Sequence, residues 1–307
     1  MKWKKIRTIG LFAVGIVAAA TVNIFAAGNV ELNIIKTLQL EATPIDVAIT
    51  PDGRQIFVLN DRGEILVYSS GQNLEGKIKV NNQVNQIKLG PRGDTLILTS
   101  SQIKTIQIAT VDFIMDINTA GAPFKGTEDA KVVIAVFDDF QWPYCARLVP
   151  VLEQVLEKYP NDVKIAFKNF PLRNHKFAMP AALAALAASE QGKFWEFHDL
   201  LFVNYNKLND QKIDEIAQTV GLNLEEYEKK KKDPAIQQKV NQDLLDGQRA
   251  GVRGTPTIFI NGILLRDRSL KGFQATIDKQ LQRHSKNSTK PSSWWIAKRN
   301  VKNSRIV

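Results

Sequence analysis

Cys145 is the only cysteine of the 307-residue chain, and it ends the stretch Trp142-Pro143-Tyr144-Cys145. A Cys-x-x-Cys pair is a redox motif, because one thiolate attacks a disulfide and the second resolves the mixed disulfide. Here Trp142 stands at the first position, so the dithiol is incomplete. One thiol can form a mixed disulfide but cannot complete an intramolecular oxidation. The candidate catalytic residues are these four, with Cys145 as the only thiol.

The spacing of this motif predicts where the thiol lies. The first position of such a motif lies at a helix N-terminus, where free N–H groups and the helix dipole stabilise a thiolate. The fourth position lies about one helical turn deeper. We therefore expect Cys145 in the resolving position, shielded from solvent, with a raised or near-normal pKa. Trp142 is expected at the exposed helix tip, where its indole offers a flat apolar surface.

Position 142 also leaves an alternative open at the level of the codon. Some thiol-redox proteins carry selenocysteine at the attacking position, encoded by UGA. A variant translation writes UGA as tryptophan. A UGA codon for Trp142 would restore a complete redox pair, whereas a UGG codon would exclude selenocysteine at this position.

Five segments surround or contain the motif in a consistent order and spacing. They are Lys131–Phe137, Asp138–Cys145, Phe167–Leu172 with His175, Gln191–Asp199, and Gly251–Thr257. Together they resemble the DsbA-type branch of the thioredoxin superfamily over roughly Pro123 to Gln282. The usual motif of that branch is Phe-x-Asp-Phe-x-Cys-Pro-Tyr-Cys, so Asp139 matches its aspartate, and Trp142 replaces its first cysteine.

The resemblance implies an α/β fold class, a thioredoxin fold with an inserted helical subdomain, and an ancestry of disulfide oxidoreductases. It also implies that the Thr255–Pro256 peptide bond is cis. In this family the residue before that proline pairs through its backbone with an extended substrate strand, so Thr255 and Pro256 are the expected substrate-binding residues. Asp139 could tune the site as a proton carrier. The expected partners are extended or unfolded polypeptides and an envelope redox partner.

Two functions of different classes follow and remain open. The first is a thiol–disulfide exchange protein reduced to the single thiol of Cys145. The second is a non-catalytic binding module that holds client polypeptides in a groove beside Trp142, Thr255 and Pro256. The exposure and acidity of Cys145 discriminate between them.

The remaining pattern predicts the elements that position these residues. A helix is expected from Pro143 to about Tyr159, then a strand from Val163 to Phe167. A helical pattern covers Lys176 to Arg249, in which Asp210 is expected to cap a helix that Gly221 closes. Asp233-Pro234 is expected to begin another helix of this region. The last expected elements are a hairpin across Asn261-Gly262 and a closing helix over Ser269–Arg283.

Residues 31–117 are predicted to form a small all-β repeat domain. The stretch around Pro51-Asp52-Gly53 alternates apolar and polar residues on both sides of the turn, and a copy follows forty residues later around Gly93. Forty residues is about the length of one β-propeller blade. Only two copies are visible, so the segment is either a small two-unit sheet packed on the next domain, which we favour, or a partial propeller completed by a partner.

The chain begins with a pattern typical of export. Four basic residues precede an uncharged, largely apolar run from Thr8 to Asn29. We favour a cleaved signal peptide over 1–27, and a retained membrane anchor stays open because the run is nearly long enough to span a bilayer. The expected location is periplasmic or extracytoplasmic, with anchoring to the inner membrane as the alternative. After a linker at 118–127, the thioredoxin-like domain is predicted over 123–284.

The net charge of +10 sits mostly at the two ends of the chain. The N-terminal region carries four basic residues, seven more lie between Arg283 and Arg305, and no acid follows Asp278. The body is therefore nearly neutral, and its charge does not predict a nucleic-acid partner. Residues 285–307 are predicted to be a basic, disordered tail, in which Trp294-Trp295 could touch a membrane or a partner.

The three histidines predict no cofactor or metal site. His175, His198 and His284 are scattered without zinc-site spacing, and one cysteine does not make such a site. Structural roles are favoured for His175 and His198. Pairing of Cys145 with His175 as nucleophile and base is disfavoured, because nothing in the local sequence orients them.

Overall fold

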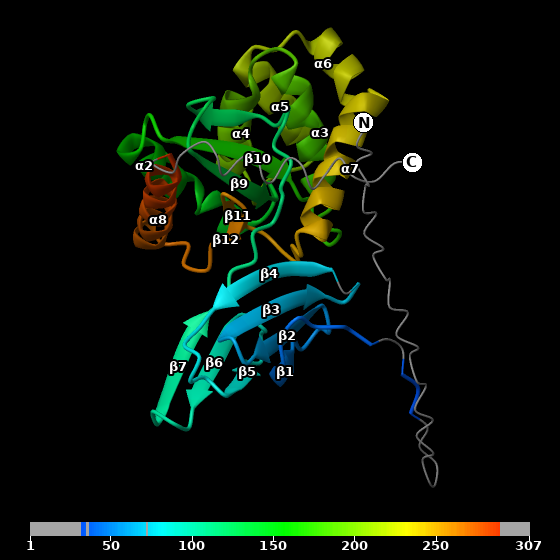
Figure 1. Ribbon diagram of the computed structural model, residues 1–307. Helices are drawn as coiled ribbons and strands as arrows, with labels where there is room; N and C mark the ends of the chain where they lie inside the picture. Colours follow the sequence, from blue (N-terminus) through cyan, green and yellow to red (C-terminus); the bar gives the residue numbers. More distant parts are fainter. Residues whose placement is uncertain (1–31, 35–36, 72, 289–307) are drawn as a thin grey trace, which may run out of the picture. The chain divides into compact units, whose positions relative to one another are not determined.

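The computed structural model describes residues 32–34, 37–71 and 73–288, which form two compact units (Figure 1). Unit 1 is Met1–Thr110 and unit 2 is Val111–Val307. Each unit has its own sheets, and each is described by itself below. The predicted signal or anchor and most of the predicted tail lie outside the described residues. None of the described helices is long and apolar enough to cross a membrane.

The described part of unit 1 contains two antiparallel sheets. Sheet 1 has the order β1-β2-β3-β4 and sheet 2 has the order β5-β6-β7. Strands β2 and β6 are forty residues apart, as the sequence repeat requires. The all-β repeat domain of the predicted fold class is confirmed, while its likeness to a propeller stays a prediction. The strands are β1 (Pro44–Ile49), β2 (Gln55–Asn60), β3 (Glu64–Ser69), β4 (Leu74–Lys79), β5 (Gln86–Leu89), β6 (Thr95–Ser100) and β7 (Thr105–Thr110).

Unit 2 is built on a mixed five-stranded sheet. Its strand order is β12-β11-β9-β10-β8, in which β9 and β10 are parallel and the other pairs are antiparallel. The predicted turn at Asn261-Gly262 joins β11 to β12 with positive φ at both residues. The strands are β8 (Phe124–Gly126), β9 (Val132–Asp138), β10 (Val163–Asn169), β11 (Thr257–Ile260) and β12 (Ile263–Leu264).

Helices cover both faces of this sheet. One face packs with α2 and α8 around Val155, Phe273 and Ile277, and the other packs against the helices inserted between β10 and β11. This arrangement confirms the predicted thioredoxin fold with an inserted helical subdomain. The helices are α1 (Pro143–Ala146), α2 (Val149–Lys158), α3 (Ala178–Ser189), α4 (Phe194–Val203), α5 (Asp210–Val220), α6 (Leu224–Lys231), α7 (Pro234–Arg249) and α8 (Leu270–Ser288).

Three local predictions for unit 2 were wrong. The helix expected from Pro143 to Tyr159 is interrupted between α1 and α2, because Pro150 has no N–H to donate to the carbonyl of Ala146. The cap of α5 is Asn209, whose side chain accepts from Lys212 N at 2.8 Å, so Asp210 is the first helical residue. Helix α8 continues past Arg283 to Ser288, so the first residues of the predicted tail are helical.

The segment that joins the repeats to the thioredoxin fold belongs to unit 2. Met115 N donates to Gly262 O at 2.9 Å, and Ile114 forms a bridge with Ile263. A side chain at Gly262 would meet Met115 O at 2.2 Å, which explains the glycine at this turn. The predicted linker at 118–127 also contributes β8 to the sheet. Residues 111–117, expected with the repeats, therefore lie with the second unit.

A buried ion cluster connects β10 to α7 in unit 2. The ammonium group of Lys168 lies 2.6 Å from Asp243 Oδ1 and 2.9 Å from Asp246 Oδ2, and it donates to Asn118 O at 2.9 Å. Burial would raise the pKa of Asp246, but its bonds to Lys168 and a neighbouring glutamine outweigh burial and lower it. Three partners satisfy all three protons of the lysine.

Candidate functional site

The candidate site lies where β9 ends and α1 begins. Asp138 is the last residue of β9, and Trp142 is the N-cap of α1. Pro143 occupies the first helical turn, where its missing N–H costs no hydrogen bond. Cys145 N donates to Trp142 O at 3.0 Å, so the cysteine lies within the short helix. The chain thus places Trp142 at the helix tip and Cys145 inside, as the spacing predicts.

The thiol of Cys145 is enclosed. Its residue is 0% exposed and belongs to the core that the inserted helices form. Burial raises the pKa of the Cys145 thiol well above its usual range, and the nearby Asp138 carboxyl raises it further. The expectation of a shielded thiol with a raised pKa is met. In this state Cys145 is neutral at physiological pH and is not an attacking nucleophile.

Two buried polar groups face this sulfur and lack full hydrogen bonding. Asp138 interacts with Cys145, yet its Oδ1 has no hydrogen-bond partner in the described structure. Burial raises the pKa of Asp138 to about 7, and the hydrogen bond from Cys145 offsets only part of this effect. The Thr255 hydroxyl lowers the pKa of the Cys145 thiol, although it forms no conventional hydrogen bond. Asp138, Cys145 and Thr255 therefore form one buried, under-satisfied cluster.

Trp142 is half-buried, which corrects the expectation of an exposed helix tip. Its indole stacks on the His175 ring at 5.2 Å between centroids and lies 5.3 Å from the Tyr144 ring. Trp142 also packs against the core of the inserted helices, so only part of its indole is exposed beside Tyr144 and His175. Tyr144 is exposed and carries the Arg147 guanidinium over its ring at 4.2 Å.

Asp139 positions the aromatic group through His175. Its Oδ2 lies 2.9 Å from His175 Nδ1 and accepts from Leu172 N at 2.8 Å, while its Oδ1 accepts from Gln141 N at 2.8 Å. His175 therefore bonds to Asp139 and stacks on Trp142. Its described contacts do not include Cys145, in keeping with the structural role favoured for it.

The Thr255–Pro256 peptide bond is cis, as the resemblance implies. Thr255 and Pro256 are both buried, and Thr255 touches Cys145 rather than Trp142 in the described contacts. Within the described residues, the main-chain N–H and C=O of Thr255 have no hydrogen-bond partner. An unpaired main-chain donor and acceptor just before β11 can form hydrogen bonds with an added strand.

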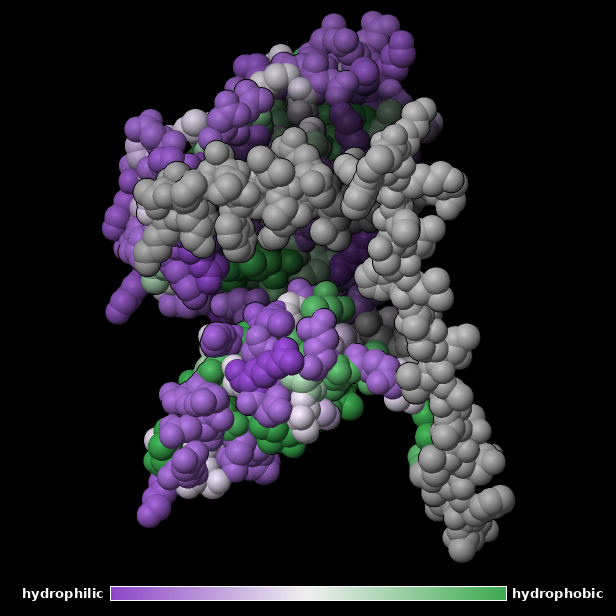
Figure 2. Space-filling model, in the orientation of Figure 1, coloured by the Kyte–Doolittle hydropathy of each residue, from purple (hydrophilic) through white to green (hydrophobic). Residues whose placement is uncertain are grey.

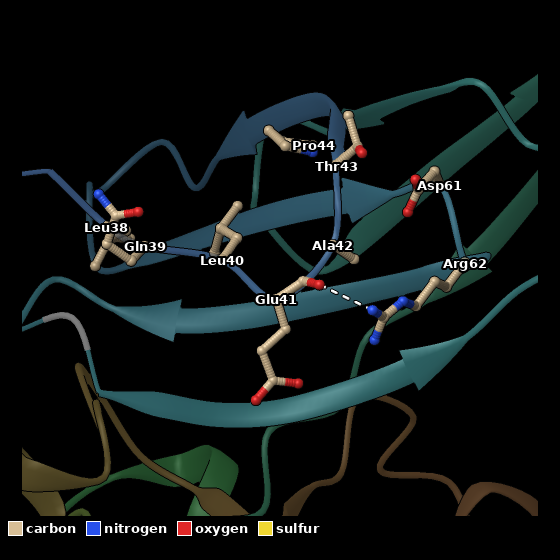
Figure 3. A pocket seen from close by; sticks show the side chains of 9 residues that line it. All are labelled: Leu38, Gln39, Leu40, Glu41, Ala42, Thr43, Pro44, Asp61 and Arg62. Atoms are coloured by element: carbon tan, nitrogen blue, oxygen red, sulfur yellow. Dashed lines mark hydrogen bonds between the residues drawn. The ribbon is translucent and has the colours of Figure 1, made fainter. Parts of the chain in front are cut away.

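The other polar features of the described residues carry no comparable chemistry. His198 bonds to Asp199 at 2.7 Å inside a cluster of aromatic rings, and burial lowers its pKa. No group of three or more metal-ligating side chains occurs within the described residues. An open surface cavity of about 550 Å³ lies in unit 1, where Arg62 donates to Glu41 O at 2.9 Å. Figure 3 shows the side chains that line it. Its lining holds neither a thiol nor an imidazole.

A thioredoxin fold with a degenerate Cys-x-x-Cys at its helix tip defines the class of unit 2. The chain matches the thioredoxin family over residues 118–279, and it belongs to this family. That match covers more than half of the chain, and it contains every candidate site residue from Trp142 to Pro256.

Solved structures and curated relatives align with the same half of the chain. A thioredoxin-like oxidoreductase from Silicibacter pomeroyi DSS-3 is 27% identical with a TM-score of 0.50, over 53% of this chain and 94% of that one. The catalytic domain of Proteus mirabilis ScsC is 26% identical with a TM-score of 0.47, over 53% and 90%. The Na(+)/H(+) antiporter NhaA 3 of Salinispora tropica is 31% identical over 50% of this chain and 23% of the antiporter. The chain thus spans less than a quarter of this curated relative.

The motif could be located from the sequence, but part of the site could not. Asp138 could be recognised only as an acid that follows a buried strand, and nothing in the local pattern showed that it would face Cys145 without a full set of partners. The stack of His175 on Trp142 joins residues 33 positions apart, and no local signal marks it. The pairing of Lys168 with α7 was missed for the same reason.

Proposed function

We propose that unit 2 is a polypeptide-binding module built on a redox fold, in which Thr255 pairs with an extended client segment. The observation that carries this proposal is that the main-chain N–H and C=O of Thr255 are unpaired beside the enclosed thiol of Cys145. A strand that adds to the loop gains backbone hydrogen bonds, and the exposed edge of the Trp142–Tyr144 group supplies apolar contact. The enclosure of Cys145 supports binding without covalent chemistry.

The experiment measures binding of a fluorescently labelled, unstructured polypeptide that contains no cysteine. Thr255→Pro removes the main-chain N–H that the proposal uses, and Thr255→Val keeps it. We expect Thr255→Val to bind like the wild type and Thr255→Pro to lose binding. Equal binding by both variants, with native circular dichroism, would reject strand addition at this loop.

A second variant tests the aromatic contact independently of the loop. We expect Trp142→Ala to weaken binding about tenfold, which corresponds to about 1.4 kcal/mol. Val203→Ala truncates an exposed apolar side chain on α4 and serves as the matched control. An unchanged affinity in Trp142→Ala would remove the aromatic group from the binding surface.

A second candidate function is supported by the position of Asp138. If client binding opens the site, the ionised form of Asp138, which predominates above about pH 7, can take the proton from the Cys145 thiol, and the resulting thiolate can attack a client disulfide. A bond then forms between Cys145 and one client sulfur, the client disulfide breaks, and the proton passes to the leaving thiolate. The product is a mixed disulfide that an envelope thiol partner must resolve, because Trp142 supplies no second thiol. Trapping of such an adduct by wild type but not by Cys145→Ser tests this step.

We also propose that the protein acts outside the cytoplasm. The basic start and the apolar run of residues 8–29 support export. N-terminal sequencing of protein from fractionated cells tests this point. A new N-terminus near residue 28 indicates a cleaved signal, and an intact one in the membrane fraction indicates an anchor.

A further inference from the structure

Four exposed arginines of unit 2 lie on the segments that meet at the candidate site. They come from the end of α1, the loop after β10, the loop before β11 and the loop before α8. These arginines are Arg147, Arg173, Arg253 and Arg268. Hydrophilic residues cover most of the surface of unit 2 that Figure 2 shows in colour, so exposed charge by itself does not mark a site. The four arginines differ in their position and in their lack of acidic partners.

Arg147 holds its charge beside the exposed ring of Tyr144. Its guanidinium lies 4.2 Å from the centre of that ring, and its Nε donates to Pro143 O at 3.3 Å. A guanidinium carries five N–H donors in a planar fork, so four remain for a further partner. Because the Tyr144 ring belongs to the proposed binding surface, a client bound there can reach these donors.

Arg173 lies in the turn that carries His175 to the indole of Trp142. His175 N donates to Leu172 O at 3.0 Å, which closes the turn, and the His175 ring stacks on Trp142. Leu172 N donates to Asp139 Oδ2 at 2.8 Å. The turn is therefore fixed at both ends to the site, and the exposed Arg173 lies between them.

The other two arginines flank the buried cluster. Arg253 precedes Thr255 by two residues in the loop before β11, and Thr255 contacts Cys145. Burial raises the pKa of Asp138 to about 7, and the positive charge of Arg268 is one of the effects that lower it. Arg268 therefore lies within electrostatic range of the Asp138 carboxyl.

None of the four arginines forms an ion pair with an acid within the described residues. Other basic groups of unit 2 are paired, as where Lys131 Nζ lies 2.9 Å from Asp162 Oδ1. Asp267 adjoins Arg268, but its Oδ1 accepts a hydrogen bond from Ser269 N at 3.0 Å at the start of α8. The fold thus leaves all four guanidinium charges available to a partner.

The two acids of the site do not oppose this charge at the surface. Asp138 and Asp139 are 3% and 1% exposed. Asp138 is mostly protonated below about pH 7, and Asp139 is engaged by His175 and two main-chain N–H groups. The body of the chain is nearly neutral, so the positive charge is a local feature of the site.

We propose that the client segment bound at Thr255 is acidic, and that its carboxylates pair with these four arginines. This inference rests on the function proposed for unit 2. A guanidinium binds a carboxylate through two parallel hydrogen bonds. An extended strand presents its side chains on alternate faces, so several carboxylates of one segment can pair with arginines from different segments of the site. Opposite charges also speed the encounter of the two chains.

The test measures binding of three fluorescently labelled, cysteine-free peptides. They have equal length and the same apolar residues, and their remaining positions are glutamate, serine or lysine. At low ionic strength we expect the glutamate peptide to bind about tenfold more tightly than the serine peptide, because several exposed ion pairs each add a modest contribution. The lysine peptide should bind most weakly. In about 1 M salt the Debye length falls to about 3 Å, and the differences should largely disappear.

Paired variants locate the charge that selects the client. Arg253→Gln together with Arg268→Gln removes two of the four charges, and should reduce the preference for the glutamate peptide to about threefold, which is half of the free-energy difference. Lys207→Gln together with Arg283→Gln removes the same charge from exposed positions outside the four segments. This matched control should keep the tenfold preference. A preference that the first pair leaves unchanged, or that both pairs reduce equally, would overturn the proposal.

The peptides also separate this inference from the function on which it rests. Equal binding of all three by the wild type would overturn the acidic preference and leave strand addition at Thr255 in place. Absence of binding by all three would reject strand addition, and the acidic preference with it. Native circular dichroism of each variant excludes unfolding as the cause of a change.

Discussion

Two buried polar clusters of unit 2 differ in how completely they are paired. Lys168 has three hydrogen-bonding or ionic partners from α7 and the segment before β8. The cluster of Asp138, Cys145 and Thr255 leaves Asp138 Oδ1 and the Thr255 hydroxyl without conventional partners. A paired buried charge stabilises the fold only while its partners remain, whereas unpaired polar groups cost stability. We infer that the first cluster stabilises the fold, and we propose that the second takes part in the function of unit 2.

The largest expected effect comes from breaking the paired cluster. Lys168→Met leaves two carboxylates almost buried without their counter-ion, and it should lower the free energy of unfolding by about 3–5 kcal/mol. Chemical denaturation at neutral pH measures this change. The triple variant Lys168→Met, Asp243→Asn, Asp246→Asn removes the charges together and is the control, expected to recover much of the loss. A fully stable Lys168→Met protein would contradict the role assigned to this cluster.

The cluster of Asp138, Cys145 and Thr255 should make the free energy of unfolding depend on pH. The folded-state pKa of Asp138 is raised from 3.8 to about 7, so the folded protein holds a proton that the unfolded chain has released. The contribution of Asp138 to the free energy of unfolding should therefore be greatest below about pH 4. It should fall as the pH rises to about 7, by up to about 1.4 kcal/mol per pH unit.

Asp138→Asn tests this pH dependence directly. The amide does not titrate, so denaturation midpoints of the variant should lose the contribution that falls between about pH 4 and pH 7. Asp112→Asn, on an acid that pairs with Arg266 at the surface, is a control for the removal of one carboxylate. Parallel pH profiles for wild type and Asp138→Asn would show that Asp138 is not held protonated.

The smallest expected effect concerns the hydroxyl of Thr255. Thr255→Val replaces a buried hydroxyl without a conventional partner by a methyl group of similar shape. The change should be neutral or should stabilise the protein by about 1 kcal/mol. Thermal denaturation measures it, and a loss of more than this amount would mean that the hydroxyl has a partner that stabilises the fold.

The fold was more predictable from sequence than the site. The turn at Asn261-Gly262 and the strand at Val163 follow from local chemistry, because glycine, asparagine and β-branched residues carry their preferences with them. Cys145 was placed correctly because the helical turn fixes its depth relative to Trp142. The break at Pro150 was also local, and its missing N–H was the signal overlooked.

The rest of the site depends on contacts between residues distant in sequence. Trp142 is half-buried because His175 and the helical core pack on it, and Asp138 Oδ1 is buried beside Cys145 without a hydrogen-bond partner. The open main chain of Thr255 likewise appears only once β11 is in the sheet. Such features follow from tertiary packing, so spacing along the chain does not determine them.

The function proposed for unit 2 depends on Cys145 being an enclosed, neutral thiol in the resting protein. The most direct test is the rate of alkylation of Cys145 against pH, measured on the native protein and again in denaturant. The structure predicts slow labelling at all pH values where the protein is folded, with a large increase on unfolding. Fast labelling of the native protein with a midpoint below neutrality, within the range of about 3.5–7.5 that activated thiols show, would mean that the thiol is accessible and activated, and it would favour a one-cysteine redox enzyme.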